Sequence, residues 1–379
     1  MKSLLIRGAQ VYLDHAFVSA DVLVKDGIIV SLDGGDAEET LDGTGAYLSA
    51  GFIDVHTHGC AGVDVNAASA MDYGTICRFE ATQGVTSFNA SVLTDTEEQT
   101  LWCIDQITTA MKEQPQMLGI HLEGPFLSTA YKGAMPESLL RTGDAALLER
   151  YCGAAKGAVR YLTISPEIDG SEAVLRKARE LGVVVAMGHS GADYETSMRA
   201  VANGVEACTH TFNAMTLLHQ HYPAIMGAAL ESDIYCEAIC DGRHLHPAVV
   251  RLLLKCKGDD RVVAITDSIM AAGLPDGQYK LGVNDVTVVD GDAKLTENGT
   301  RAGSTLTCAQ ALRNIMRFTG RDMVHTLPLL TENPARLMRV WARKGSIEVG
   351  KDADMVLLDG AGEVLATISA GRTIYKKEK

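Results

Sequence analysis

Eight apolar runs of strand length, spaced along the middle of the chain, constrain the fold more than any other feature of the sequence. Most segments between them have the residue pattern of amphipathic helices, as in "DTEEQTLWCIDQITTAMKEQ". Alternating strands and helices in this number predict a (β/α)8 barrel of the TIM type, an α/β fold. A doubly wound open sheet is the alternative, and the number of strands disfavours it. The runs lie at residues 51–56, 84–91, 117–124, 159–167, 182–190, 204–211, 234–242 and 261–268.

The two ends of the chain have a different pattern. Short β-rich runs separated by Gly and Asp turns occur in residues 1–49 and again in 340–379. Neither end has enough strands for a stable sheet by itself. We therefore expect one small β domain built from both termini, and a barrel domain over residues 50–339.

Composition excludes several kinds of partner. The net charge of −14 disfavours binding to nucleic acid or to an anionic membrane surface. No apolar run reaches the roughly 20 residues of a membrane helix, and the start "MKSLLIR" does not have the pattern of a signal peptide. The nine cysteines include no CxxC pair, which is typical of reduced thiols. These features predict a cytoplasmic protein. The acidic balance does not forbid an anionic small substrate, because a pocket can be locally positive.

Metal-type ligands follow the ends of several of the predicted strands. His56 and His58 stand two residues apart, so in a strand their rings share one face and can converge on one ion. Taken alone, the pair could equally be satisfied by local hydrogen bonds. Chemistry in a barrel of this type belongs at the carboxyl ends of the strands, and more such residues occur there. They are Glu123, His189, His210, His244 and Asp267. Histidine and carboxylate ligands together predict zinc or another first-row divalent ion.

Several longer motifs carry a resemblance that covers nearly the whole chain. They include "GFIDVHTHG", "HLEGPF", "GHSGADYE", "THTFNAM", "CDGRHLHP", "AGSTLT" and "GSIEVGKDADMVLLD". In this ordered set the chain resembles the amidohydrolase superfamily and, within it, the N-acetylglucosamine-6-phosphate deacetylases. The resemblance implies a barrel with a small β-sandwich domain, and usually a homodimer.

The resemblance also implies roles for individual residues. The principal metal site corresponds to Glu123, His189 and His210, and a second site to His56 and His58, with Glu123 able to bridge two ions. Asp267 corresponds to the catalytic acid and base, and His244 to a second catalytic group that holds the oxyanion. One or two divalent ions per subunit are implied, with zinc first and iron, manganese or cobalt as alternatives. Substrate contacts correspond to Ala134, Met135, Asn213, Ala214, His221, His244, Arg301, Ala302 and Gly303.

Four positions depart from the family pattern. His221 stands where the family often has an arginine that reaches the substrate phosphate in a neighbouring subunit. Met135 replaces a histidine, Arg301 replaces a common leucine, and Arg243 replaces an apolar residue. If His221 simply takes the arginine's place, preference for a 6-phosphate should be weak and should fade as pH rises. The alternative is that Arg243 or Arg301 supplies the missing cation.

The reaction predicted from the resemblance is metal-dependent hydrolysis of the acetamide of an N-acetyl amino sugar. N-acetylglucosamine 6-phosphate is the first choice of substrate, giving glucosamine 6-phosphate and acetate. N-acetylgalactosamine 6-phosphate, a non-phosphorylated amino sugar, an N-acyl amino acid and a cyclic amide are the alternatives. A non-catalytic barrel would be expected to lack some of the ligands, and none is missing. No GxSxG motif of a serine hydrolase occurs in the sequence.

Overall fold

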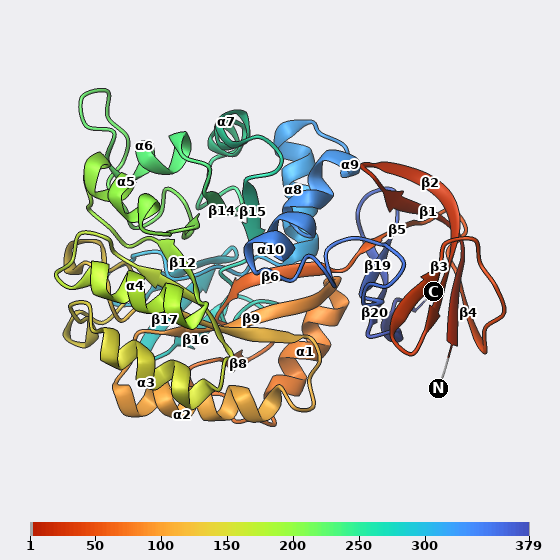
Figure 1. The fold of residues 1–379 in the computed structure, drawn as a ribbon, viewed down its shortest axis with the longest axis horizontal. Helices are drawn as coiled ribbons and strands as arrows, with labels where there is room; N and C mark the ends of the chain where they lie inside the picture. Colours follow the sequence, from red (N-terminus) through yellow and green to blue (C-terminus); the bar gives the residue numbers. More distant parts are fainter. Residues whose placement is uncertain (1–2, 379) are drawn as a thin grey trace.

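The computed structural model describes residues 3–378, so Met1 and Lys2 of the start, and Lys379, lie outside the described residues. Eight parallel strands form one sheet that curls into a nearly closed barrel (Figure 1). Each of the eight apolar runs supplies one of them, which confirms the predicted barrel. In sheet order they are β6 (Phe52–Thr57), β9 (Val85–Leu93), β10 (Met117–Glu123), β11 (Val159–Ile164), β12 (Val184–Met187), β13 (Ala207–Cys208), β14 (Tyr235–Ile239) and β15 (Val262–Ile265).

The barrel closes where β15 returns to β6. The amide of Asp267 donates to the His56 carbonyl at 2.9 Å, and the amide of His58 donates to the Ser268 carbonyl at 2.8 Å. The hydroxyls of Thr57 and Ser268 lie 2.8 Å apart across the same seam. The backbone that closes the barrel therefore belongs to residues that carry candidate site side chains.

Helices between consecutive strands cover the outside of the barrel (Figure 1). Several begin at a side chain that accepts from a free amide of the first turn, as Thr96, Asp144, Asp193 and Thr307 do. Among the helices of residues 3–378, none is long and apolar enough to cross a membrane. The helices are α1 (Tyr73–Thr82), α2 (Glu97–Ala110), α3 (Ala145–Ala155), α4 (Ser171–Leu181), α5 (Tyr194–Ala202), α6 (Ala224–Glu231), α7 (Pro247–Lys257), α8 (Cys308–Thr319), α9 (Met323–Thr326) and α10 (Glu332–Leu337), with short 3₁₀ turns at Thr129–Tyr131, Glu137–Leu139 and Leu327–Leu329.

Both chain ends contribute to a second sheet, which lies beside the barrel (Figure 1). Its strands run in the order β21-β20-β19-β5-β1-β2-β3, and β4 pairs with β1. The two ends meet where β5 pairs antiparallel with β19. The strands are β1 (Ser3–Leu13), β2 (Ala16–Lys25), β3 (Ile28–Ser31), β4 (Glu39–Asp42), β5 (Tyr47–Ala50), β19 (Met355–Leu358), β20 (Val364–Ser369) and β21 (Arg372–Lys376).

A three-stranded antiparallel sheet, which the sequence analysis did not anticipate, is inserted between β15 and α8. It consists of β16 (Gly277–Leu281), β17 (Asn284–Val289) and β18 (Asp292–Leu295). We call it the inserted sheet. Its buried side chains pack on residues of the barrel loops in an apolar cluster of Leu93, Leu127, Met135, Ile269, Ala271, Leu281, Val286, Val288, Ala293, Leu295 and Ala302. A further two-stranded ribbon, β7 (Gly59–Cys60) with β8 (Val63–Asp64), follows the first barrel strand.

Candidate active site

Six of the predicted site residues converge at the carboxyl end of the barrel. His56 lies in β6, Glu123 ends β10, and the other four follow β6, β12, β13 and β15. None of their side chains belongs to a residue more than 7% exposed. His189, His210 and Asp267 have backbone φ angles of 49°, 28° and 50°, a left-handed conformation that costs non-glycine residues energy and is concentrated at functional sites. The sharp turn at each strand end directs the side chain inward, onto the barrel axis.

Glu123, His189 and His210 form the first of two candidate metal-binding groups. The Glu123 Oε1 atom lies 3.2 Å from Nε2 of His189 and 3.2 Å from Nε2 of His210. The two imidazole Nε2 atoms are 3.0 Å apart. The structure thus brings the three residues of the predicted principal site together.

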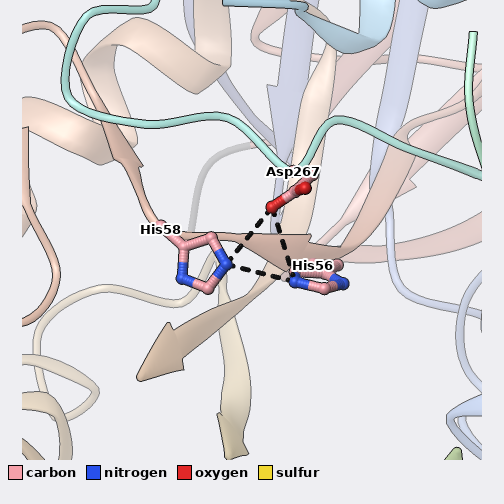
Figure 2. Close-up of side chains that lie close together, drawn as sticks. All are labelled: His56, His58 and Asp267. Carbon is pink, nitrogen blue, oxygen red and sulfur yellow. Dashed lines mark hydrogen bonds and ion pairs between the residues drawn. The ribbon is translucent and has the colours of Figure 1, made fainter. Parts of the chain in front are cut away.

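His56, His58 and Asp267 form the second group (Figure 2). The Nε2 atoms of the two histidines are 3.1 Å apart, and Asp267 Oδ1 lies 3.2 Å from Nε2 of His58 and 3.6 Å from that of His56. Glu123 joins this group to the first one, because its Oε2 lies 3.2 Å from His58 Nε2 and its Oε1 lies 3.5 Å from His56 Nε2. A single carboxylate therefore faces all four imidazoles.

The hydrogen bonds behind the imidazoles show that these groups suit a cation. Nδ1 of His189 lies 3.0 Å from the Tyr131 carbonyl, and Nδ1 of His58 lies 3.0 Å from the Ser91 carbonyl. Since a carbonyl only accepts, each Nδ1 carries the proton, and the Nε2 of a neutral ring is left with its lone pair. As long as the rings are neutral, those lone pairs point at other Nε2 atoms and at Glu123, which are themselves acceptors, so either added protons or a metal ion must lie between them. A positive ion resolves this opposition of acceptors, and the nitrogen and oxygen donors suit zinc or another first-row divalent ion.

Comparison with known proteins agrees with this geometry. The family model described as "Amidohydrolase family" matches residues 47–374. The chain belongs to the amidohydrolase family. As a member of that family it is a hydrolase. The barrel fold and the metal-type side chains at its strand ends agree with this assignment.

Individual relatives of this amidohydrolase are similar over most of their length. It is 34% identical to the N-acetylglucosamine-6-phosphate deacetylase of Bacillus subtilis (strain 168), covering 87% of this chain and 85% of that protein. It is also 34% identical to the N-acetylgalactosamine-6-phosphate deacetylase of Escherichia coli O157:H7, covering 91% of each. Among solved structures, a mutant N-acetyl-D-glucosamine-6-phosphate deacetylase from Mycobacterium smegmatis, in complex with N-acetyl-D-glucosamine-6-phosphate, superposes with a TM-score of 0.93 at 30% identity over 99% of this chain and 100% of that one.

The charges of the site depend on one another. Burial alone lowers the pKa of both His56 and His58, but the carboxylates of Glu123, Glu237 and Asp267 outweigh it. They raise the pKa of His56 well above its ordinary value and that of His58 to about 9. Burial alone raises the pKa of Glu123 and Asp267, and the facing imidazoles outweigh it in turn, so both pKa values are lowered. Both carboxylates are therefore ionised at neutral pH.

Glu237 on β14 is a site residue that the sequence analysis missed. Its Oε2 accepts from Nδ1 of His56 at 3.1 Å and from the backbone amide of His210 at 2.9 Å, and its Oε1 accepts from the Tyr161 hydroxyl at 2.7 Å. It is 0% exposed, so it orients one histidine of each metal-binding group from behind. A signal was present in the sequence, because Glu237 is a charged residue inside the apolar run "IYCEAIC".

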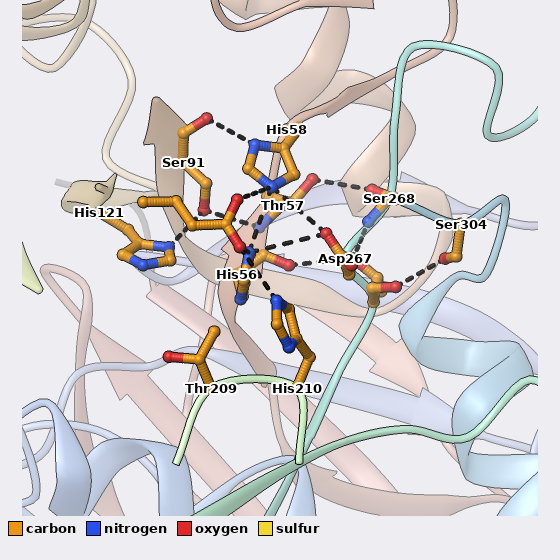
Figure 3. A network of polar contacts seen from close by, with 12 residues as sticks. His56, Thr57, His58, Ser91, His121, Thr209, His210, Asp267, Ser268 and Ser304 are labelled. Atoms are coloured by element: carbon orange, nitrogen blue, oxygen red, sulfur yellow. Dashed lines mark hydrogen bonds and ion pairs between the residues drawn. The ribbon is translucent and has the colours of Figure 1, made fainter. Parts of the chain in front are cut away.

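A buried polar network surrounds these ligands (Figure 3). The ring of His121 lies 2.9 Å from the Ser91 hydroxyl and 2.9 Å from the Thr163 hydroxyl. Asp54 accepts from the Thr266 hydroxyl at 2.5 Å and thereby links β6 to the segment after β15. Burial raises the pKa of Asp54 to about 6.

His244 approaches the site from the segment after β14. Its Nδ1 lies 2.7 Å from Asp241 Oδ2, and Asp241 also accepts from the amides of Arg243 and His244 at 2.8 Å. The hydrogen bond from His244 lowers the pKa of Asp241 against the effect of burial, which raises it. Asp241 therefore fixes the ring and leaves Nε2 available to a ligand.

A cavity of about 210 Å³ opens above the two metal-binding groups. Gly303 in the cavity wall must be a glycine. Its φ is +58°, and a Cβ at this position would lie 2.4 Å from Ile269. The cavity wall includes most of the substrate contacts implied by the resemblance, namely Ala134, Met135, Asn213, Ala214, His244, Arg301 and Gly303.

Two implied contacts lie elsewhere. Ala302 is 1% exposed, and its side chain belongs to the apolar cluster under the inserted sheet. His221 is exposed on the loop between β13 and α6, where its amide donates to Nδ1 of His219, and it does not line the cavity of its own chain. Met135 lines the cavity and is also part of the apolar cluster, so it gives that wall an apolar face in place of a histidine.

Proposed function

We propose that this amidohydrolase removes the acetyl group of an N-acetyl amino sugar 6-phosphate. The preferred substrate is N-acetylglucosamine 6-phosphate, and the products are glucosamine 6-phosphate and acetate. The observation that carries the proposal is the position of Asp267. Its ionised carboxylate completes the group of His56 and His58, lies beside the group of Glu123, His189 and His210, and lines the cavity. The names of the relatives supply the substrate class.

The proposed mechanism assigns a task to each side chain. When a divalent ion is bound by Glu123, His189 and His210, it supplies Lewis acidity toward the acetamide carbonyl and makes a water molecule more acidic. Asp267, held as a carboxylate, takes the proton of the attacking water and then delivers it to the amine leaving group. His244, fixed by Asp241, faces the cavity and stabilises the oxyanion. The buried walls keep other water away from the reacting carbonyl.

N-acetylgalactosamine 6-phosphate is the second candidate substrate. The specific reason is that relatives named for each of the two sugars are equally identical to this chain, at 34%. The deciding experiment is acetate release from N-acetylglucosamine, N-acetylgalactosamine, N-acetylmannosamine and their 6-phosphates. We expect the highest kcat/KM with N-acetylglucosamine 6-phosphate. Absence of acetate release from all six compounds would refute the proposed function.

Glu123→Ala tests the metal assignment separately. Since Glu123 faces all four imidazoles, we expect the variant to lose both bound metal and turnover. A Glu123→Ala protein that keeps its full metal content would contradict the assignment of Glu123 as a ligand. We propose zinc as the resident ion, and a second ion of the same kind at His56, His58 and Asp267.

The remaining parts of the proposal concern organisation. We propose a β-sandwich domain of residues 1–49 with 340–379 and a barrel domain of residues 50–339. The support is a separate apolar core whose buried members, from Leu4 to Leu48 and from Ile347 to Ile368, all fall in the two terminal segments. We also propose a homodimer in the cytoplasm. The exposed Leu217, Leu218 and Tyr222 of the loop between β13 and α6 suit contact with a second copy, and free thiols suit a reducing compartment.

A further inference from the structure

Arg301 is placed to act as the phosphate-binding cation of the cavity. Among the described residues that line it, Arg301 is the one side chain with a permanent positive charge. The other charged or titratable groups in the wall are the carboxylates of Glu123 and Asp267 and the histidines already described. A phosphate monoester that enters this cavity with its acetamide toward Asp267 therefore meets a single fixed cation from the same chain.

The inserted sheet determines where Arg301 points. The segment after β18 turns back and runs beside it, with Arg301 opposite Lys294 and the amide of Ala302 donating to the Ala293 carbonyl at 3.1 Å. Since side chains alternate along an extended chain, Ala302 and Ala293 face the apolar cluster while Arg301 faces the other way. This alternation places Arg301 on the same face as Asp292 and Lys294, away from the side chain of Ala302. Arg301 is among the residues that line the cavity.

Asp292 holds the guanidinium of Arg301 in place with two parallel hydrogen bonds. Nε of Arg301 donates to Oδ1 at 2.8 Å, and Nη2 donates to Oδ2 at 3.1 Å. Nη1 donates to the Arg243 carbonyl at 3.1 Å. A guanidinium has five N–H donors, so donors remain for a ligand. Lys294 also contacts Asp292, at 2.9 Å, so one carboxylate is shared by two cations and the trio keeps a net positive charge.

The other two candidate cations are less well placed. The guanidinium of Arg243 donates to the carbonyl of Asp290, and Arg243 does not line the cavity. His221 does not line the cavity of its own chain either, and it is exposed on the loop between β13 and α6. Within one chain the geometry therefore favours Arg301 over both.

We propose that Arg301 recognises the phosphate of a phosphorylated amino sugar from within the same chain, and that Asp292 is its positioning residue. This inference rests on the proposed function, since it names the residue that selects the phosphorylated substrate. It implies that the ratio of kcat/KM for the phosphorylated sugar to kcat/KM for the free sugar stays constant between pH 6 and pH 8, because arginine stays charged throughout.

The test compares kcat/KM for N-acetylglucosamine 6-phosphate and for N-acetylglucosamine in the parent and in Arg301→Leu. Charge-assisted hydrogen bonds of this kind predict a loss of about 10–100-fold for the phosphorylated sugar. The value for the free sugar should stay within about threefold of the parent. Arg301→Lys should recover part of the loss, because it keeps the charge and loses the fork. Asp292→Asn should raise KM for the phosphorylated sugar and leave kcat nearly unchanged.

Arg243→Ala is the matched control, since it removes a neighbouring arginine side chain that lies outside the cavity. Inorganic phosphate serves as a second probe. We expect it to inhibit hydrolysis of the free sugar by the parent and to inhibit Arg301→Leu more weakly. Equal losses for both sugars in Arg301→Leu, or an unchanged ratio between them, would overturn the inference and leave the proposed function standing. A parent that releases no acetate from either sugar would overturn both.

Discussion

The carboxyl ends of the barrel strands and the inserted sheet both face the same cavity, and they are built in opposite ways. The six convergent residues of the barrel are at most 7% exposed, and their rings and carboxylates contact one another. On the inserted sheet the side chain of Arg301 is 38% exposed, and its main partner is one carboxylate. The proposed roles follow this difference, with a rigid surface for the chemistry and a more adaptable surface for selecting the substrate.

Physical reasons support that division. A proton transfer or a metal site tolerates little displacement, so its ligands are placed on strands that neighbouring strands hold on both sides. Recognition of a dianion at the mouth of the cavity tolerates more, since an arginine fork is long and can adjust. An inserted sheet can change its charge pattern without disturbing the barrel, because its own apolar cluster supports it.

The largest effect on turnover should come from a substitution at the end of a barrel strand. We expect Asp267→Asn to lower kcat by at least about 10³–10⁴-fold, because asparagine fills the same space and cannot carry the proton in either step. Acetate release measures turnover, and metal analysis checks that the group around Glu123 stays loaded. Asp285→Asn is the matched control, since that carboxylate is 68% exposed on β17 of the inserted sheet. Activity of Asp267→Asn within tenfold of the parent would show that Asp267 serves only as a ligand or a structural residue.

A smaller effect on metal affinity and turnover is expected from Glu237, which lies behind the metal-type side chains. Glu237→Gln keeps the shape and removes the charge that orients His56 and the His210 amide. Such supporting residues are typically worth about 10–100-fold in metal affinity or activity. Metal content after dialysis against a chelator, together with kcat, measures the change. Glu206→Gln, at a carboxylate that is 36% exposed, is the control. Unchanged metal retention in Glu237→Gln would mean that the buried layer does not tune the site.

Metal removal should reverse the pH dependence of stability. After chelation, the pKa of folded His58 is about 9 against an ordinary value of 6.5. A raised pKa stabilises the fold fully below pH 6.5, and this contribution is lost as pH rises to 9. We therefore expect the Tm of the chelated protein to fall by a few degrees between pH 6.5 and pH 9. Metal-loaded protein should not show this fall, because metal binding competes with protons and strengthens as pH rises. Thermal scans with and without chelator decide it, and parallel curves would contradict the expectation.

The smallest effect should be a local loss of stability that is confined to the inserted sheet. Val286 is 0% exposed in the apolar cluster, so Val286→Ala should weaken that sheet by about 2 kcal/mol. Hydrogen exchange should speed up over residues 277–295 while the barrel strands keep their protection. Turnover of the free sugar should change little. Equal loss of protection in the barrel strands would show that the two regions unfold together, and that the inserted sheet is not an independent unit.

Much of the barrel could be predicted from the sequence, because strands buried on both faces appear as continuous apolar runs. The convergence of His56, Glu123 and Asp267 followed from the rule that parallel strands place their carboxyl ends at one edge. Glu237 was missed because the same rule directs attention to strand ends, and Glu237 lies inside a strand.

The inserted sheet could not be predicted in the same way. Its strands are short and partly exposed, as the alternating pattern of β16 shows, and they lie among Gly and Asp turns that also suit a loop. Arg301 was recognised as unusual from its position alone. Its partner Asp292 depends on which residues face each other across β18 and the returning segment, and strand register is a property of the folded backbone.

The seam of the barrel has a consequence for the order in which the protein can assemble during synthesis. Each other pair of neighbouring barrel strands consists of two barrel strands that follow one another in the sequence. At the seam, in contrast, the Thr57–Ser268 contact joins residues 211 positions apart. Loops of that length close slowly, because many chain conformations must be given up before the contact forms. A nascent chain holds all of Glu123, His189 and His210 once residue 210 has been made, but it lacks Asp267 until the last barrel strand has followed. The residues of the first group are therefore all present before the last barrel strand is made, whereas the group at the seam becomes complete only when the barrel itself closes.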